Sequence, residues 1–388
     1  MGVMATPSSD RILTTHTGSL ARPPELVQLL SDRAEGRTVD EVGFRACVRS
    51  AMAEAVRRQV EAGIDVVSDG EMGKPGFANY VMDRMTGFGG EDSGGLFRPR
   101  DVLDFPELER RLFGTQPATR ARRPANDGPI AYVGGPALAA DLADLSAALT
   151  AAGAGGAFVP AASPGCVVQI MPTTHYATRR EYLFALAEAL RVEYRAIVEA
   201  GFLLQVDCPD LAMGRHVEFG DRPAAEFHAN LALHVAALNH ALEGIPQERV
   251  RVHVCWGNYA GPHHRDVPLR EILPAIYDVN AAGISIEAAN PRHEHEWTVF
   301  RDLPPPPEKY LIPGVIDSCT NYIEHPEVVA QRLVRFAETV GRERVVGGTD
   351  CGFATFAGFS AVVPDIAYAK LSSLAEGAHL ATTELWGR

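Results

Sequence analysis

Three stretches of the chain share one pattern: EAGIDVVSDGE at residues 61–71, EAGFLLQVDCPD at residues 199–210 and AAGISIEAAN at residues 281–290. In each stretch a helical run ends at Ala-Gly, a short apolar run follows, and an acidic residue closes it. A helix that leads directly into a buried strand, three times over, indicates an α/β protein with a parallel sheet. The glycines predicted to end the helices are Gly63, Gly201 and Gly283.

Further apolar runs with polar ends complete a series of eight predicted strands. These runs are ILTTHTGS (12–19), RVRVHVCWGN (249–258), KYLIPGVIDS (309–318), ERVVGGTDC (343–351) and GAFVPAAS around Phe158, which we prefer to CVVQIMPT around Ile170. Apolar residues at helical spacing predict helices at Val42–Glu61, Arg180–Glu199, Pro223–Glu243, Leu269–Ala281, Pro326–Val340 and Ile366–Thr382. Eight such units predict a (β/α)8 TIM barrel whose polar strand ends form one working face.

One segment interrupts this rhythm. Residues 86–163 are Gly-rich, then charged, then Ala-rich, and we expect them to form an insertion between the second and third strands. A hairpin is predicted near Ile130–Gly134, with helical segments around it. The rest of residues 1–388 is expected to be one barrel domain.

Composition restricts the class of partner. The chain has 388 residues and a formal net charge of −13, so neither a nucleic-acid partner nor an anionic membrane surface is expected. The most apolar stretch, Ala147–Met171, is rich in Gly, Pro and Ser and does not read as a membrane span. The first twelve residues lack the features of a secretory signal, and six scattered cysteines do not suggest a disulfide scaffold. We therefore expect a cytoplasmic protein with reduced thiols that acts on small molecules.

Four residues at predicted strand ends suggest a metal site. His253 and Cys255 are two positions apart and share one face of a strand, while Glu287 and Cys351 end two other strands. Two thiolates, one imidazole and one carboxylate suit tetrahedral Zn²⁺. The alternative is that the cysteines are small buried hydrophobes. Zinc with thiolate ligands keeps a bound thiol deprotonated, which favours S-alkylation over hydrolysis.

Other polar residues near strand ends are candidates for substrate contact. Glu71 and Asp207 are expected to touch substrate, although either could instead accept backbone hydrogen bonds. His16 and Asp210 are candidate catalytic groups. His263 and His264, in the sequence GPHHRD, are predicted to be solvated, and either could carry a proton.

The chain resembles the catalytic C-terminal barrel of cobalamin-independent methionine synthase, from TTHTGSL to GGTDCGF. It looks most like the single-barrel members of that superfamily, which include epoxyalkane:coenzyme M transferase. The resemblance implies zinc held by His253, Cys255, Glu287 and Cys351, the set reached above from strand ends. It also implies substrate contacts from Ser19 in the Gly18-Ser19 pair, Glu71 in the Gly70-Glu71 pair, and Asp207.

The resemblance has two departures. Where the synthase has Glu-Pro after the aspartate, this chain has Cys208-Pro209; where the synthase has Asp-Ile-His after its seventh strand, this chain has residues 317–319, Asp-Ser-Cys. The proton relay of that histidine is therefore missing here or lies elsewhere.

The function expected is zinc-dependent transfer to a homocysteine-like thiol from a methyl donor. A folate, a corrinoid protein or an epoxide could supply the alkyl group. Epoxide opening by coenzyme M and a lyase related to uroporphyrinogen decarboxylase remain alternatives, as does a zinc-stabilised binding barrel without catalysis.

Overall fold

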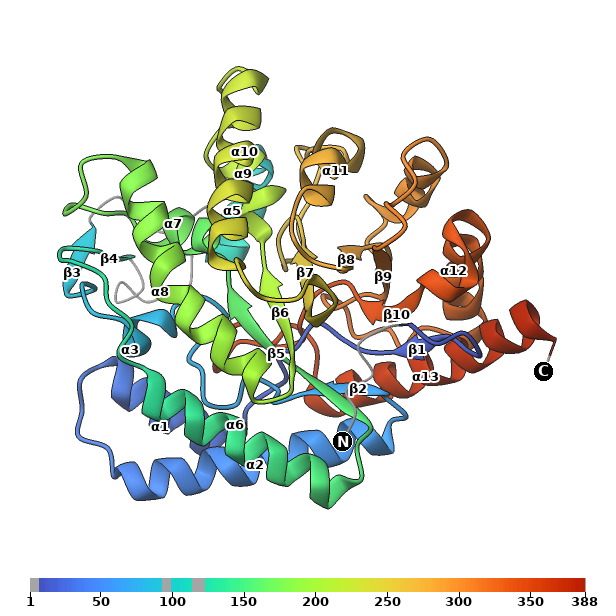
Figure 1. Ribbon diagram of the computed structural model, residues 1–388, viewed down its shortest axis with the longest axis horizontal. Helices are drawn as coiled ribbons and strands as arrows, with labels where there is room; N and C mark the ends of the chain where they lie inside the picture. Colours follow the sequence, from blue (N-terminus) through green and yellow to red (C-terminus); the bar gives the residue numbers. More distant parts are fainter. Residues whose placement is uncertain (1–6, 93–98, 114–122, 388) are drawn as a thin grey trace.

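The computed structural model of the protein describes residues 7–92, 99–113 and 123–387, and its centre is a barrel of eight parallel strands (Figure 1). The strands follow one another around the sheet in the order β1, β10, β9, β8, β7, β6, β5, β2, and a bridge between Thr15 and Val66 joins its two ends. The predicted (β/α)8 barrel is thus confirmed. The barrel strands are β1 (Leu13–Thr14), β2 (Val66–Ser68), β5 (Gly156–Ala162), β6 (Leu203–Asp207), β7 (Val250–Val254), β8 (Gly283–Glu287), β9 (Tyr310–Ile316) and β10 (Val346–Thr349).

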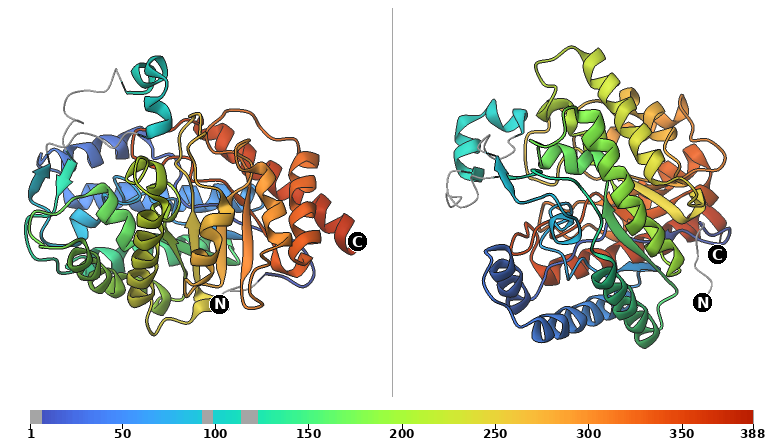
Figure 2. Two further views of the ribbon diagram at one scale, coloured as in Figure 1. Left: turned by 90° about the horizontal axis from the view of Figure 1, so that it is seen from above. Right: turned by 60° about the vertical axis from the view of Figure 1, so that its left-hand side comes forward.

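Helices surround the strands on all sides (Figures 1 and 2). The principal ones are α1 (Pro24–Ala34), α2 (Glu41–Glu61), α6 (Gly135–Ala152), α7 (Pro164–Ile170), α8 (Arg179–Glu199), α10 (Ala224–Ala241), α11 (Leu269–Tyr277), α12 (Pro326–Val340) and α13 (Pro364–Trp386). Shorter elements are α3 (Val81–Arg84), α9 (Gly214–Val217), η2 (Pro209–Leu211), η3 (Gln247–Arg249), η4 (Glu294–Arg301) and η5 (Arg342–Arg344). Among the described residues, no helix is both long and apolar enough to cross a membrane.

The helix boundaries follow from local chemistry. The side chain of Asp40 accepts from the first amides of α2, and Thr178 with Glu181 forms a reciprocal cap on α8. Gly63 and Gly201 follow their helices with φ of 86° and 96°, as predicted.

The prediction for Gly283 is wrong, because this residue begins β8, six residues after α11 ends at Tyr277. Its lack of a side chain serves close packing instead. A Cβ on Gly283 would lie 2.6 Å from the Cβ of Arg251 on the neighbouring strand.

The insertion between the second and third barrel strands is shorter than residues 86–163. Helix α6, which packs against α2, and strand β5 both lie inside that range and belong to the barrel. The described remainder contains β3 (Gly90–Asp92), α4 (Arg100–Leu103), α5 (Pro106–Phe113) and β4 (Arg123–Ala125); residues 93–98 and 114–122 lie outside the described part of the chain. Figure 2 shows α4 and α5, in cyan, standing out from the body of the barrel.

The antiparallel pair of the insertion also lies elsewhere than predicted. It joins β3 to β4, whereas the stretch at Ile130–Gly134 pairs with residues before the insertion. Thr86 donates its amide to the carbonyl of Ala131, and Val133 donates to that of Arg84. The prediction of a hairpin near residue 130 is therefore wrong, because the backbone there forms hydrogen bonds with residues earlier in the chain.

The interior of the barrel is polar at the level where the strands approach the working face. Arg251 of β7 donates to Gln205 Oε1 (2.9 Å), Thr15 Oγ1 (2.9 Å) and the carbonyl of His16 (2.8 Å). Its guanidinium lies 3.4 Å from the ring centroid of Phe158. One buried cation thus connects strands β7, β6 and β5 with the segment that follows β1.

We expect Arg251→Met to lower the free energy of unfolding by at least about 3 kcal/mol, because three buried acceptors lose a charged donor. Urea denaturation followed by circular dichroism measures this. The matched control is Arg195→Met on the exposed side of α8, which should change the free energy by no more than about 0.5 kcal/mol. Equal stability of the two variants would contradict a structural role for the buried guanidinium.

Candidate active site

Strand ends bring three of the four predicted metal ligands together, and the fourth, Glu287, lies beside one of them. His253 lies in β7 and Cys255 directly follows it; Glu287 is the last residue of β8, and Cys351 follows β10. The side-chain ligand atoms of His253, Cys255 and Cys351 lie within 4.8 Å of one another. Glu287 Oε1 lies 3.8 Å from the Sγ of Cys351. All four side chains are buried.

The protonation states of these four side chains are compatible with a metal cation bound between them. Burial and the charge of Arg251 lower the pKa of His253 to about 3, so its imidazole is neutral. Nδ1 lies 3.2 Å from Ser285 Oγ, while the buried Nε2 has no hydrogen-bond partner among the described residues. A buried ring nitrogen without a partner is costly unless something binds it. Cys255 and burial raise the pKa of Cys351, and a cation would reverse that shift by favouring the thiolate.

Hydrogen bonds hold the loops around these residues. Trp256 donates its amide to Glu287 Oε1 (2.9 Å), and Asn290 donates to Oε2 (3.0 Å). Asp350 Oδ1 accepts the amides of residues 288 and 289, which fixes the end of β8. Asn258 donates to the carbonyl of Gly352 (2.7 Å) and so joins the loops after β7 and β10.

Ser19 reaches this face from the loop after β1. A Cβ on Gly352 would collide with the Oγ of Ser19, so the serine lies directly against the residue that follows Cys351. The amide of Phe353 donates to the carbonyl of Ser19 (2.9 Å). The structure therefore brings Ser19 beside the segment that follows Cys351.

Glu71 and Asp207 form an acidic pair on the same face. Burial and the charge of Glu71 raise the pKa of Asp207 to about 8, and burial likewise raises the pKa of Glu71. Glu71 Oε2 is buried without a hydrogen-bond partner among the described residues. Glu71 also has φ of 57°, a conformation that side-chain-bearing residues rarely adopt and that is common at functional sites.

The side chains of His16 and Asp210 form hydrogen bonds with other residues of the barrel and its helices. His16 Nε2 donates to Gln59 Oε1 (2.7 Å) and Nδ1 accepts the amide of Gly18, so both ring nitrogens are engaged. Asp210 accepts from Ser163 Oγ (2.6 Å) and lies 2.8 Å from His234 Nδ1. Both residues are buried.

The structure corrects the prediction that His263 is solvated, since its side chain is only 5% exposed. His264 is 39% exposed and pairs with Asp104 of the insertion. Sequence reasoning also missed Lys74, whose buried ammonium donates to the carbonyl of Pro160 (2.5 Å) and lies 4.3 Å from the ring centroid of Tyr80. No spacing signal marks this lysine, because its role depends on contacts with a distant strand.

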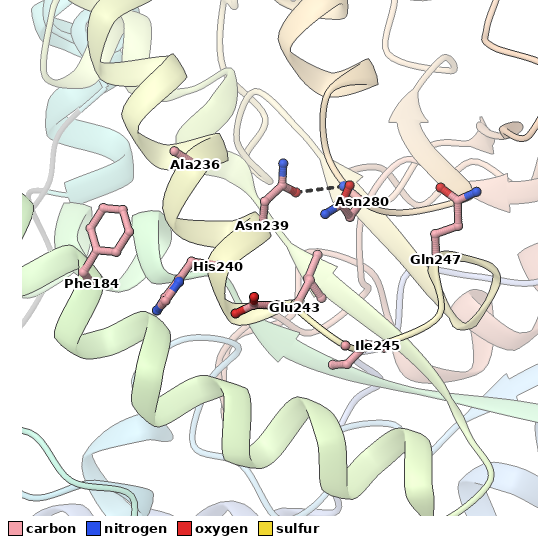
Figure 3. Close-up of a pocket in the computed structure, with 10 residues that line it drawn as sticks. Phe184, Ala236, Asn239, His240, Glu243, Ile245, Gln247 and Asn280 are labelled. Carbon is pink, nitrogen blue, oxygen red and sulfur yellow. Dashed lines mark hydrogen bonds between the residues drawn. The ribbon is translucent and has the colours of Figure 1, made fainter.

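A surface hollow of ≈ 540 Å³ lies between α8 and α10, away from these residues (Figure 3). Gln247 and Asn280, which line it, precede β7 and β8. The hollow therefore lies toward the opposite end of the barrel from the candidate site.

Comparison with known proteins gives consistent matches. Residues 165–369 match the sequence profile of the family described as "Cobalamin-independent synthase, Catalytic domain". A methionine synthase of Thermococcus kodakarensis is 26% identical over 375 residues, covering 96% of this chain and 94% of that protein. A 2-hydroxypropyl-CoM lyase of Xanthobacter autotrophicus is 24% identical over 367 residues, covering 87% and 86%. A B12-independent methionine synthase from Shewanella sp. W3-18-1, solved with selenomethionine, has a similar fold, with a TM-score of 0.72, 20% identity and coverage of 97% and 100%.

The raised pKa of Asp207 predicts a specific pH dependence of stability. The folded state keeps the proton up to about pH 8, whereas the unfolded chain releases it near about pH 4. Because the folded state binds more protons in this window, wild-type stability should fall as pH rises from about 4 to about 8, by at most about 1.4 kcal/mol per unit.

Asp207→Asn should make this slope shallower, which urea denaturation at a series of pH values measures. Asp365→Asn, at a carboxylate that is 85% exposed, is the control and should retain the wild-type slope. Parallel curves for wild type and Asp207→Asn would show that Asp207 is not protonated in the fold.

Proposed function

The chain belongs to the family of cobalamin-independent synthase catalytic domains, and we propose that it transfers a methyl or other alkyl group to the sulfur of a small thiol. The residues proposed to hold zinc are His253, Cys255, Glu287 and Cys351. The observation that carries the proposal is His253, whose buried Nε2 has no partner among the described residues and whose imidazole brings a ring nitrogen within 4.8 Å of two cysteine sulfurs. When bound there, zinc would supply a Lewis acid that holds the substrate sulfur as a thiolate at neutral pH.

The acidic pair supports an amino thiol as the acceptor. Glu71 Oε2 is a buried acceptor that lacks a donor among the described residues, and an ammonium group would supply one. A positive charge would also allow Asp207 to lose its proton. Homocysteine carries such an ammonium next to its carboxylate, and Ser19 is proposed to donate to that carboxylate.

A sulfonate thiol would need a nearby arginine, and the two candidates, Arg22 and Arg292, already have other hydrogen-bond partners. Arg22 is buried and donates to the carbonyls of Ala354, Glu71 and Lys74. Arg292 is exposed, and its contact is with the carbonyl of His264. Coenzyme M would also place a sulfonate near Glu71 and Asp207, and each of these carboxyl groups repels it once ionised. Epoxide opening by that thiol is thus the second candidate, and the similarity to a 2-hydroxypropyl-CoM lyase is what favours it.

The chain's own residues would supply orientation and exclusion of water. The ammonium and carboxylate contacts fix the acceptor so that its sulfur faces one direction. Because the acceptor is already oriented when it is bound, the activation free energy of alkyl transfer is lower. The face is lined by buried side chains, and attack on the alkyl donor would take place with little water present. The donor is proposed to be a methyl-bearing folate or corrinoid protein. A cytoplasmic location stays a prediction.

We expect Cys351→Ser and Cys255→Ser each to lower the zinc bound at these four residues severalfold and to reduce alkyl transfer at least about 100-fold, since each loses a thiolate ligand. Metal analysis and an assay with homocysteine and a methyl donor measure these effects. Cys47→Ser, at a helical cysteine far from the site in sequence, is the control and should keep both zinc and activity. Full activity after both site changes would reject the zinc mechanism.

Glu71→Gln tests the choice of acceptor. Loss of the charged hydrogen bond should raise the KM for homocysteine by about 10- to 100-fold, and should leave use of coenzyme M unchanged or improved. Steady-state kinetics with both thiols separates these cases, and the exposed Glu25→Gln serves as the control. An unchanged KM for homocysteine would contradict the assignment of its ammonium to Glu71.

A further inference from the structure

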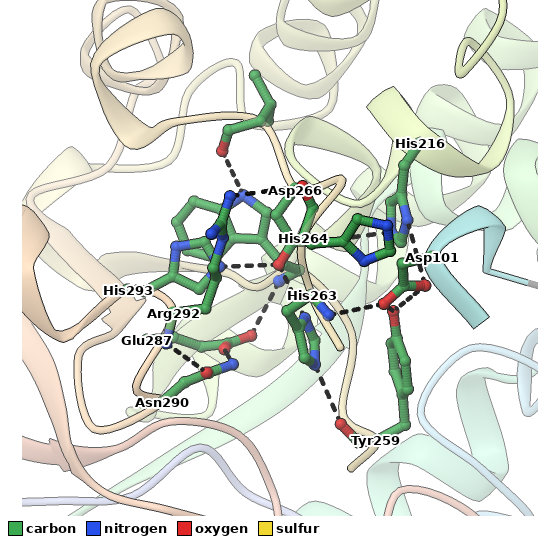
Figure 4. Close-up of polar contacts among 12 residues, drawn as sticks. Asp101, His216, Tyr259, His263, His264, Asp266, Glu287, Asn290, Arg292 and His293 are labelled. Atoms are coloured by element: carbon green, nitrogen blue, oxygen red, sulfur yellow. Dashed lines mark hydrogen bonds and ion pairs between the residues drawn. The ribbon is translucent and has the colours of Figure 1, made fainter. Parts of the chain in front are cut away.

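A second group of polar residues lies buried beside the candidate active site. It consists of His216 in α9, His263 and Asp266 in the loop after β7, and His293 in the loop after β8, and we call it the histidine cluster (Figure 4). Each of these side chains is at most 5% exposed. The cluster shares no residue with the proposed zinc ligands and takes no part in the function proposed above.

Three atoms of the cluster converge. His263 Nδ1 and His293 Nε2 each lie 2.8 Å from the same oxygen, Oδ2 of Asp266. All three atoms lie within 4.8 Å of one another. Small movements outward would give the spacing that two nitrogens and one oxygen adopt around a first-row metal ion.

The outer ring nitrogens indicate which way the lone pairs point. His263 Nε2 lies 3.1 Å from the carbonyl of Tyr259, and a carbonyl only accepts, so Nε2 carries hydrogen. His293 Nδ1 lies 2.8 Å from Glu296 Oε2, whose other oxygen accepts the amide of Leu269. If both rings are neutral, both inner nitrogens therefore present lone pairs to a carboxylate. These facing groups are satisfied either by a proton on each inner nitrogen or by a metal cation between them.

This arrangement of outer partners is that of metal-bound histidines. A histidine that binds a metal usually donates its other ring N–H to a carbonyl or a carboxylate, which fixes the ring and its tautomer. His263 has the carbonyl of Tyr259 and His293 has the carboxylate of Glu296. His263 is held there with φ of 54°, and among the described residues only Glu71 shares a positive φ without being glycine.

His216 is a fourth candidate ligand at the edge of the cluster. Neither of its ring nitrogens has a hydrogen-bond partner among the described residues, although the side chain is 1% exposed. Its Nε2 lies 3.8 Å from Asp266 Oδ1, which also lacks a partner in the described part of the chain, and its Nδ1 lies 3.7 Å from Asp101 Oδ1. Two unpartnered buried groups thus face each other at the edge of the cluster.

We propose that His216, His263, Asp266 and His293 form a second metal site that takes a divalent cation with nitrogen and oxygen ligands, zinc above all. Three imidazoles and one carboxylate match the preference of Zn²⁺ for tetrahedral sites. The alternative is that protons fill the cluster. The carboxylates of Asp266 and Glu296 oppose the effect of burial and raise the pKa of His293 to about 9, so metal binding would displace protons and would weaken at low pH.

The position of the cluster gives this metal a structural role. Asp101, in helix α4 of the insertion, accepts the amide of His263 (2.8 Å) and the hydroxyl of Tyr259 (2.8 Å). Trp256 stacks on His293 with ring centroids 3.9 Å apart, and its amide donates to Glu287. A cation here would fasten the insertion to two barrel loops and hold in place the residue that orients a proposed ligand of the first site.

The test separates the two sites with the double variant Cys255→Ser/Cys351→Ser. After equilibration with Zn²⁺ and removal of excess metal, the double variant should retain about one zinc per chain, and wild type about two. X-ray absorption of the double variant should show nitrogen and oxygen neighbours with imidazole scattering and no sulfur. Adding His263→Gln and His293→Gln should remove this zinc, whereas adding His264→Ala, at the neighbouring exposed histidine, should not.

Two results would overturn the second site. One is a wild-type protein that holds about one zinc, bound to sulfur, and a folded double variant that holds none; the cluster would then be filled by protons. The other is residual zinc in the double variant that survives the His263→Gln and His293→Gln changes. Circular dichroism of each variant shows whether it has folded, and the wild-type stoichiometry decides the matter even if a variant fails to fold. These zinc counts do not depend on whether the protein transfers an alkyl group. The proposed function and the second metal site can therefore be rejected independently of each other.

Discussion

The buried guanidinium of Arg251 is the interaction on which the working face depends. It connects β7 to Gln205 on β6 and to Thr15 and the carbonyl of His16 after β1. Gln205 in turn donates to the carbonyl of Thr17 (2.5 Å) and to Asp207 (2.8 Å). A charged group inside a barrel is costly unless every donor is used, and here its partners are the backbone and side chains that lead to Ser19 and Asp207. The polar layer therefore sets where the substrate-facing loops begin.

Above this layer the site is assembled from loops that hold one another. Trp256 and Asn258 after β7 and Asp350 after β10 fix the backbone around Glu287 and Cys351. None of these three is a proposed ligand, yet each determines where a ligand side chain points. Outer partners of this kind tune a metal site nearly as strongly as its ligands do. The histidine cluster extends the same arrangement outward to the insertion.

The barrel could be predicted from the sequence because it depends on periodic signals, and the four proposed ligands were found because their positions at strand ends are also visible in the sequence. A helix followed by a short apolar run and an acidic residue predicts a βα unit, and parallel strands place all their ends on one face. Helix boundaries such as that of α12 at Pro326–Val340 follow from local pattern and are confirmed.

The features that the sequence did not predict depend on contacts between distant segments. His263 lies in a polar stretch that resembles an exposed loop, and contacts with distant segments, including Asp101 more than 150 residues away, explain its burial. Gly283 has the sequence context of a helix end but is a strand residue that makes room for Arg251. His16 is near the predicted site in sequence, yet its ring is hydrogen-bonded to Gln59 of α2. Proximity along the chain does not establish which way a side chain points.

The central claim is that this chain activates a thiol on zinc at the face where β7, β8 and β10 end. Zinc-edge X-ray absorption of the His263→Gln/His293→Gln variant, which isolates the first site, tests it most directly when measured with and without homocysteine. The account predicts a shell of two sulfurs with nitrogen and oxygen neighbours that gains one sulfur when homocysteine is added. A shell without sulfur, or one that neither homocysteine nor coenzyme M changes, would contradict it.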